Sequence, residues 1–208
     1  MVGTKKKIMD AALALFAERG YANVYVAQIA DAVGIKAPSL YKHYKSKQEI
    51  FGAILTELKT GYHRQAAALQ MNGNDAMADA RMFSAASKEE LVKIGMGLFA
   101  FFLHDDYAKK CRRMMTVEQF RDPELAQLLS RQYADDPLAY QSAMFAYLGG
   151  TGVLRQYDPG VMALQFYAPI HMLLSLCDRH PEREGELTAL LEKHIRQFSS
   201  IYAKEESK

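Results

Sequence analysis

The sequence predicts an all-α protein, with an N-terminal three-helix helix-turn-helix domain joined by a long helix to a larger α-helical domain. Apolar residues recur with a period of about 3.6 residues along almost the whole chain, as on the buried face of a helix. No segment alternates apolar and polar residues as a half-buried strand does. Half of the 208 residues are hydrophobic, which is enough to form a core. We therefore expect two helical domains, residues 1–46 and residues 47–208.

The first helix is expected to begin after Thr4 as its N-cap and to end at Gly20. Its apolar residues fall on one face: Ile8, Ala11, Ala12, Leu15 and Phe16. Two short helices are expected next, over about residues 26–33 and 37–43, with Gly34 at the turn between them, where a positive φ is cheap only for glycine. A helix, a turn that contains glycine and a second helix form the pattern of a helix-turn-helix, here over residues 26–46.

The second short helix would expose side chains that suit DNA, because the second helix of a helix-turn-helix normally enters the major groove. Groups that suit base edges are those of Lys36, Ala37, Pro38, Ser39, Lys42 and His43. The phenol of Tyr41 and the ammonium groups of Lys45 and Lys47 suit phosphate oxygens. Residues 1–50 carry a net charge of +4 and the rest of the chain −2, which fits a polyanion contact at one end. The alternatives are a chance fluctuation in charge and a solvated surface on an ordinary helical hairpin.

The N-terminal segment also resembles the DNA-binding domain of the TetR/AcrR family of bacterial transcriptional regulators. The resemblance extends from Ile8 to about Ile54 and is carried by Gly20-Tyr21, Val26-Ala27-Gln28-Ile29-Ala30 and the continuous run from Val33 to Lys47. It implies that Tyr41 and Lys47 hold phosphates and that Gly34 forms the turn. It also implies that four residues face bases: Pro38, Ser39, Lys42 and His43.

Two positions depart from the family pattern. Val24 and Tyr25 stand where the family often has Thr or Ser as N-cap and phosphate contact. Tyr25 cannot cap a helix in that way, and we expect its hydroxyl to reach a phosphate instead. Lys36 stands where the family often has Ser, which places a cation at a helix N-terminus at a cost of about 0.3–1 kcal/mol unless the ammonium meets DNA.

The rest of the chain is expected to be helical. A long helix, about residues 47–70, begins after Ser46 as its cap and is broken by Asn72-Gly73-Asn74. Another follows Ser87, with Glu90 placed to complete a capping box. Further helices are expected over about residues 106–120, 123–134, 137–151, 159–178 and 183–203. Asp-Pro pairs at 122–123, 136–137 and 158–159 mark three helix starts, and the glycine-rich segment 149–152 ends a helix.

A homodimer is expected, because one short recognition helix reads only a few base pairs and two half-sites of a near-palindromic double-stranded operator give useful specificity. We expect it to form through residues 159–203, where each of the last two helices has a wide apolar stripe. The stripes are Met162, Phe166, Ile170, Leu173, Leu174 and Cys177, and Leu187, Leu190, Leu191, His194, Ile195, Phe198 and Tyr202. The alternative is that both stripes are buried within one chain.

Residues 75–157 are rich in aromatic and methionine side chains, which suit a small apolar or aromatic effector. The candidate effector-binding residues are His63, Phe99, Phe102, Met114, Met115, Tyr140, Met144 and Tyr147. We expect the effector to move the long helix and so release the DNA, as in a repressor, with a coupling of about 1–3 kcal/mol. The alternatives are a plain hydrophobic core, and a regulator or adaptor that a protein partner controls without a small molecule.

No pattern indicates an enzyme, a metal site or a cofactor. The six histidines form no His-Glu-x-x-His motif, there is no Gly-x-Ser-x-Gly, and Cys111 and Cys177 stand 66 positions apart without a Cys-x-x-Cys. No apolar run of about 20 residues indicates a transmembrane helix. We expect a cytoplasmic protein with no membrane association.

Overall fold

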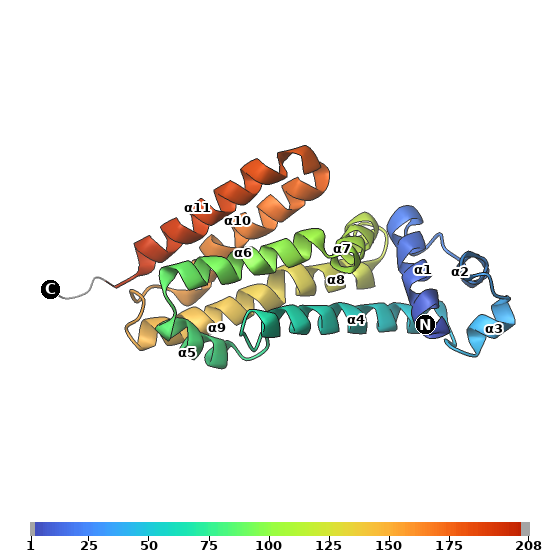
Figure 1. Cartoon of the computed structure of the whole chain (residues 1–208), viewed down its shortest axis with the longest axis horizontal. Coiled ribbons are helices and arrows are strands. Elements are labelled where there is room, and N and C mark those ends of the chain that lie inside the picture. The colour runs from blue at the N-terminus through green and yellow to red at the C-terminus, as the bar shows by residue number, and fades with distance from the viewer. Residues whose placement is uncertain (1–2, 205–208) are drawn as a thin grey trace. The chain divides into compact units, whose positions relative to one another are not determined.

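The computed structural model describes residues 3–204 and confirms the all-α prediction (Figure 1). The helices in chain order are α1 Thr4–Arg19, α2 Val26–Val33, α3 Ala37–Tyr41, α4 Lys47–Ala68, α5 Ala76–Ala85, α6 Lys88–His104, α7 Asp106–Glu118, α8 Pro123–Ser130, α9 Asp136–Gly150, α10 Pro159–Arg179 and α11 Glu184–Tyr202. A π-helical turn spans Arg131–Asp135 and a 3₁₀ turn spans Pro181–Arg183. Pairing of β type among the described residues is limited to an isolated antiparallel bridge between Leu154 and Ala203.

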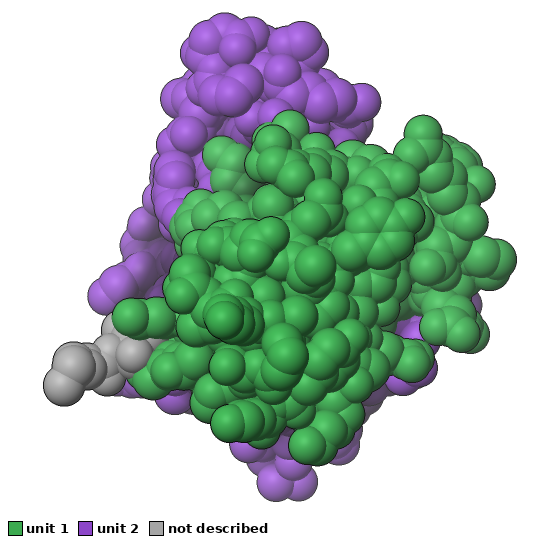
Figure 2. All heavy atoms as spheres, turned by 90° about the vertical axis from the view of Figure 1, so that its right-hand side faces the viewer, with its two compact units in different colours: residues 1–61, 105–129 green, residues 62–104, 130–208 purple. Residues whose placement is uncertain are grey.

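The chain divides into two compact units, which Figure 2 distinguishes by colour. Unit 1 combines the N-terminal residues up to 61 with residues 105–129, and unit 2 combines residues 62–104 with those from 130 onward. The segment 105–129 contains α7 and all of α8 except its last residue, Ser130, and α7 packs on α1. The N-terminal helices therefore share a core with a segment that lies far from them in the sequence.

The core of unit 1 is formed by apolar side chains of α1, α2, α3, α4 and α7, and glycine and serine residues mark the ends of these helices. Its fully buried side chains include Ile8, Leu13 and Phe16 of α1, Ile29 of α2, Leu40 of α3, Ile50 and Ile54 of α4, and Met114 and Met115 of α7. Gly20 and Gly34 end α1 and α2 with φ of +84° and +74°, as the sequence predicts. The Ser46 hydroxyl oxygen accepts a hydrogen bond from the Glu49 N–H group at 3.0 Å, which confirms the predicted cap of α4.

Several helix boundaries differ from the prediction. The predicted Thr4 cap is wrong, because Gly3 is the N-cap residue and Thr4 is already helical. The segment Ala76–Ala85 forms α5, a helix that the periodicity did not indicate, and the Asp75 side chain caps it by accepting from the Met77 and Ala78 N–H groups.

Helix α9 begins at Asp136, as the Asp136-Pro137 pair predicts, but no loop precedes it, because the chain is helical without a break from Pro123 to Gly150. A π turn precedes the proline, and the Asp136 N–H group donates to the Arg131 carbonyl oxygen. Pro137 has no N–H group to donate, and a wider turn directly before it lets the helix continue.

The two apolar stripes of α10 and α11 serve mainly as the core of unit 2. Leu173, Leu174 and Cys177 of α10 pack with Leu187, Leu191 and Ile195 of α11, and with three residues of α6: Val92, Phe99 and Leu103. The interpretation of these stripe residues as a dimer interface is therefore wrong, and the alternative of burial within one chain holds for them. Their periodicity showed an apolar face but not what covers it.

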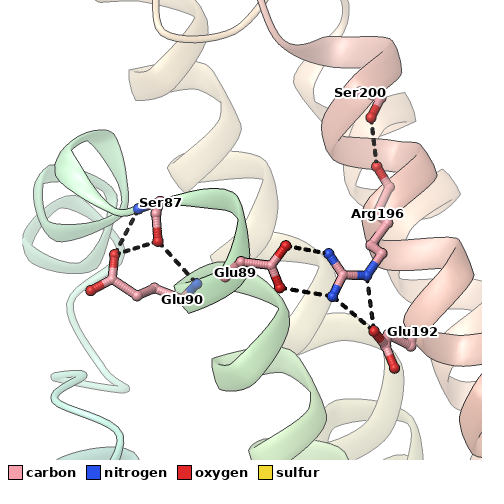
Figure 3. A network of polar contacts seen from close by, with 6 residues as sticks. All are labelled: Ser87, Glu89, Glu90, Glu192, Arg196 and Ser200. Atoms are coloured by element: carbon pink, nitrogen blue, oxygen red, sulfur yellow. Dashed lines mark hydrogen bonds and ion pairs between the residues drawn. The ribbon is translucent and has the colours of Figure 1, made fainter.

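Polar contacts join α6 to α11 and cap α6 (Figure 3). The Arg196 guanidinium of α11 donates to both carboxylate oxygens of Glu89, at 2.6 and 2.8 Å. Ser87 and Glu90 form the predicted capping box, with the Ser87 N–H donating to Glu90 at 2.7 Å and the Glu90 N–H donating to the Ser87 hydroxyl at 3.2 Å. The Arg196–Glu89 pair is exposed, so it adds little stability despite its geometry.

A buried carboxylate organises the loop that ends α4. Asp79 of α5 accepts hydrogen bonds from the N–H groups of Asn72 and Gly73, at 2.7 and 2.8 Å, and from the Tyr140 hydroxyl of α9. Three donors satisfy a charge that burial would otherwise disfavour. The predicted break at residues 72–74 is thus held by α5 and α9.

Alkaline unfolding should report on Tyr140. Burial, followed by the hydrogen bond to Asp79, raises the pKa of the Tyr140 phenol. In the unfolded chain a tyrosine ionises at about pH 10, so the folded protein keeps the phenolic proton of Tyr140 to a higher pH. The stabilisation is complete below about pH 10 and is lost as the pH rises further. We expect Tyr140→Phe to flatten the alkaline decline of the free energy of unfolding, measured by urea denaturation. The exposed Tyr157→Phe is the control, and an equal decline in both variants would contradict the assignment.

Candidate nucleic-acid interface

The turn between α2 and α3 positions the exposed side of α3. Ile29 and Ala30 of α2 and Leu40 of α3 are buried, so these helices pack against each other and the rest of unit 1. The Ile35 N–H group donates to the Ala30 carbonyl oxygen at 3.0 Å, across the left-handed Gly34. The opposite side of α3 is therefore free to meet a ligand.

Nine of the ten predicted DNA-contact residues lie in the short segment from Lys36 to Lys47, and the tenth, Tyr25, is the N-cap of α2. Six of the ten are exposed: Tyr25, Lys36, Pro38, Tyr41, Lys42 and Lys45. The other four are half-buried: Ala37, Ser39, His43 and Lys47. The structure thus brings the predicted set together on one part of unit 1, and their contact with DNA stays a prediction.

The exposed cations of this segment are available to an anion. Among residues 3–204, neither Lys36 nor Lys42 forms an ion pair. The Lys45 ammonium donates to the Tyr41 carbonyl oxygen at 3.3 Å and has no carboxylate partner among these described residues. Lys36, as the N-cap of α3, makes no side-chain cap, so its ammonium is not engaged by its own helix.

The unusual entry to α2 is capped from inside the helix. The Gln28 side-chain oxygen accepts a hydrogen bond from the Tyr25 N–H group at 2.8 Å. This is one of the two hydrogen bonds of a capping box, the one in which the N3 side chain accepts from the backbone N–H group of the N-cap residue. The Tyr25 side chain is 70% exposed, so its hydroxyl is free to reach a phosphate.

Lys47 is engaged within unit 1. Its ammonium donates to the carbonyl oxygens of Tyr21 and Val24, at 2.8 and 3.0 Å, and lies 4.2 Å from the centre of the Tyr21 ring. Burial lowers the pKa of Lys47, and the nearby Glu118 carboxylate partly offsets this effect. The first residue of α4 therefore holds the loop between α1 and α2.

A basic residue that the site prediction omitted lies beside α3. The Lys5 ammonium is 5.0 Å from the centre of the Tyr44 ring, and the Tyr44 hydroxyl donates to the Lys5 carbonyl oxygen at 3.3 Å. The Lys5-Lys6-Lys7 run entered the charge count but had no local pattern that linked it to α3. The contact with Tyr44 brings the start of α1 to the end of the recognition segment.

The predicted effector-binding residues do not all come together. Met114 and Met115 belong to the core of unit 1, whereas the other six lie in unit 2. Phe99 and Met144 are core residues of unit 2. The remaining four are half-buried: His63, Phe102, Tyr140 and Tyr147.

Phe102 is part of a chain of aromatic rings in unit 2. It lies 6.0 Å from the Tyr62 ring and 6.2 Å from the Tyr133 ring, and Tyr133 lies 6.3 Å from the His171 ring. Tyr62, Tyr133 and His171 were not among the predicted residues, although each is an aromatic residue at helical spacing. His63 lies beside this chain, with a ring nitrogen 3.3 Å from the Asn74 side-chain amide.

Both cysteines lie in the core as thiols. Among the described residues no group of three His, Cys, Asp or Glu side chains could hold a metal ion. Cys111 and Cys177 are buried free thiols, and burial raises the pKa of Cys111 to about 12.

Comparisons with known proteins single out the same N-terminal region. Residues 8–54 match the family model of bacterial regulatory proteins, tetR family. A segment is 47% identical over 47 residues to the biofilm operon icaADBC HTH-type negative transcriptional regulator IcaR of Staphylococcus epidermidis. That match covers 23% of this chain and 25% of the regulator, so the chain spans about a quarter of the curated relatives it matches.

The fold as a whole is similar to solved regulators. A TetR family transcriptional regulator from Pseudomonas syringae pv. tomato has a TM-score of 0.66 at 19% identity, over 99% of this chain and 100% of that one. SmeT, the repressor of the Stenotrophomonas maltophilia multidrug efflux pump SmeDEF, has a TM-score of 0.63 at 22% identity, over 98% and 92%. SmeT has also been solved in complex with triclosan. At these identities the likeness concerns the fold alone.

Proposed function

We propose that this chain, whose residues 8–54 match the family model of bacterial regulatory proteins, tetR family, is a dimeric DNA-binding transcriptional regulator controlled by a small molecule. The observation that carries the proposal is the set of uncompensated cations and exposed polar groups on and around α3, above all Lys36 and Lys42. Such a surface fits the phosphates and base edges of a major groove. Repression is the mode that we propose, and its setting is the bacterial cytoplasm.

The contact residues divide by the chemistry of their groups. Four residues would face base edges, because they lie on α3 or in the turn that directly follows it: Pro38, Ser39, Lys42 and His43. Tyr25, Tyr41 and Lys45 would bind phosphates with exposed hydroxyl and ammonium groups, and Lys36 and Ala37 would meet DNA at the start of α3. Lys5 adds a cation at the same end of unit 1.

Dimer formation through residues 159–203 is supported by apolar side chains that the chain leaves uncovered. Val161, Leu164 and Met172 of α10 are exposed, and about 3.6 residues per turn bring them onto one stripe. Leu190 and Ile201 do the same on α11, which packs beside α10 (Figure 1). Helix α10 is long and apolar enough to cross a membrane, a criterion that core helices of soluble proteins also meet. Most of its length is not buried within one chain. A second copy would cover this face as a four-helix bundle.

Effector control is supported by the aromatic chain of Tyr62, Phe102, Tyr133 and His171 in unit 2. Flat aromatic surfaces and methionines suit an apolar or planar effector, and triclosan, which SmeT binds, has that chemistry. Tyr62 lies on α4, the helix that begins with Lys47. A shift of α4 would alter DNA affinity about 5–150-fold for a coupling of about 1–3 kcal/mol.

Selection from a random pool of DNA duplexes with the full chain tests the proposal. On the selected duplex we expect Lys45→Met to weaken binding to all sequences and to reduce the salt slope by about 0.9, because one phosphate contact is lost. Lys42→Met should instead relax the preference at one base pair, by about 1–3 kcal/mol.

Lys59→Met, a change of the same charge at an exposed position of α4, is the matched control and should leave the base preference unchanged. If the full chain enriches no sequence from the pool, the proposed function is wrong.

A further inference from the structure

Glu118, at the end of α7, is a buried carboxylate without a hydrogen-bond donor. Its side chain is 0% exposed, and neither oxygen has a hydrogen-bond partner among the described residues. It lies against the turn that ends α1, since a Cβ atom on Gly20 would stand 2.0 Å from its Oε1. Burying a charge in this way is costly unless an opposite charge lies near.

The cation nearest in its electrostatic effect is the Lys47 ammonium, which forms no direct ion pair with Glu118 among the described residues. The Glu118 carboxylate acts on it electrostatically, and the same ammonium donates to the carbonyl oxygens of Tyr21 and Val24. An ammonium group has three donors, so two of the three are directed at the loop between α1 and α2. Glu118 thus lies against Gly20 at one end of this loop, and Lys47 at the start of α4 binds its carbonyl groups. Tyr25, the N-cap of α2, follows the loop directly.

We propose that Glu118 is a positioning residue for DNA binding, which acts through Lys47 to hold the loop of residues 20–24 and with it Tyr25 and the start of α2. The proposal rests on the function proposed above. It changes the role of Lys47, which the sequence resemblance identified as a direct phosphate contact, to one of holding the loop from inside. It also gives α7 a part in DNA affinity, although α7 has no predicted DNA contact.

The segment that carries Glu118 is continuous at both ends with unit 2. Asp105 alone separates α7 from α6, and α8 passes directly into the π turn. A displacement of either end of the segment 105–129 would therefore act on Glu118 through the chain itself.

A double-mutant cycle on the selected duplex tests the proposal, with the full chain and salt titrations for each variant. Glu118→Gln should lower DNA affinity at least about tenfold when Lys47 is present, and less than about threefold in a Lys47→Met background. Glu124→Gln removes a carboxylate from an exposed position of α8 and is the matched control for general charge effects, with less than about a threefold change expected. Lys47→Met should lower affinity without the loss of about 0.9 in salt slope that Lys45→Met produces.

Two outcomes would overturn the proposal. One is an effect of Glu118→Gln that is absent or equal in both backgrounds. The other is a loss of salt slope in Lys47→Met equal to that in Lys45→Met, which would make Lys47 a phosphate contact.

Chemical labelling provides a readout that needs no DNA. With limiting acetic anhydride and mass spectrometry, Lys47 should react more slowly than the exposed Lys45 in the unmodified protein, because its nitrogen is half-buried and held by two carbonyl oxygens. Glu118→Gln should raise the Lys47 rate at least about threefold and leave the Lys45 rate unchanged. An unchanged Lys47 rate would overturn the proposal even if the protein binds DNA. If the full chain selects no DNA, the proposed function fails, while the labelling still decides whether Glu118 controls Lys47.

Discussion

Replacing Gly20 by alanine is expected to lower the free energy of unfolding by about 2 to 6 kcal/mol, the largest effect of a single methyl group that we expect in this chain. Two independent penalties meet at this residue. Its φ of +84° and ψ of +151° lie close to a region that only glycine occupies readily, which costs other residues about 1–3 kcal/mol. The added Cβ would also stand 2.0 Å from Glu118 Oε1, and such overpacking costs about 1–3 kcal/mol.

Gly34 is the matched control, because it carries only one of the two penalties. Its φ of +74° and ψ of +31° are left-handed helical, and no atom lies within 4 Å of a Cβ built there. We expect Gly34→Ala to cost about 1–2 kcal/mol and Gly34→Asn less, since asparagine tolerates this conformation. Gly20→Asn should not be tolerated in the same way. Urea denaturation followed by circular dichroism measures all four variants, and equal losses for Gly20→Ala and Gly34→Ala would contradict the role of Glu118.

The contrast between these glycines also shows what the sequence could predict. Both were identified as helix-ending residues, because a glycine after an apolar helical stripe is a local signal. The carboxylate beside Gly20 could not be predicted, because Glu118 belongs to a distant segment and nothing in its own neighbourhood marks it as buried. For the same reason the grouping of residues 105–129 with the N-terminal helices was not predicted.

In the candidate site, too, features with a local sequence signal were predicted and those that depend on other segments were not. The exposed face of α3 follows from helical spacing and from the family resemblance, so Lys36, Pro38 and Lys42 could be named in advance. The inward direction of the Lys47 ammonium depends on carbonyl groups of a loop, and a side-chain type does not determine it. Tyr62 and Tyr133 were missed for a related reason, since an aromatic residue at helical spacing is equally typical of a plain core.

Periodicity was least informative on the last two helices. It identified a wide apolar surface on α10 and α11, but the share covered by the chain itself depends on where α6 packs. Leu173 and Leu191 face that core, whereas Leu164 and Leu190 are 53% and 48% exposed. The exposed pair, and not the buried residues of the stripes, is therefore the position at which to test the dimer.

Leu164→Glu combined with Leu190→Glu is expected to convert the protein to a monomer and to lower its affinity for the selected duplex about 100–10,000-fold. Two reading units joined in one dimer bind the second half-site as an intramolecular step, and a monomer loses that advantage. The fold should be retained, because both side chains are exposed within one chain and the new carboxylates would stay in water. Sedimentation analysis gives the oligomeric state, and fluorescence anisotropy gives the affinity.

Met77→Glu is the matched control, since Met77 is also exposed, at 41%, but lies on α5, outside the proposed interface. It should remain dimeric, with DNA affinity changed only by the general effect of one added negative charge. A double variant that is still a dimer would place the interface elsewhere than on α10 and α11. A monomer that keeps full affinity would show that one recognition helix is enough, and the argument from two half-sites would then be wrong.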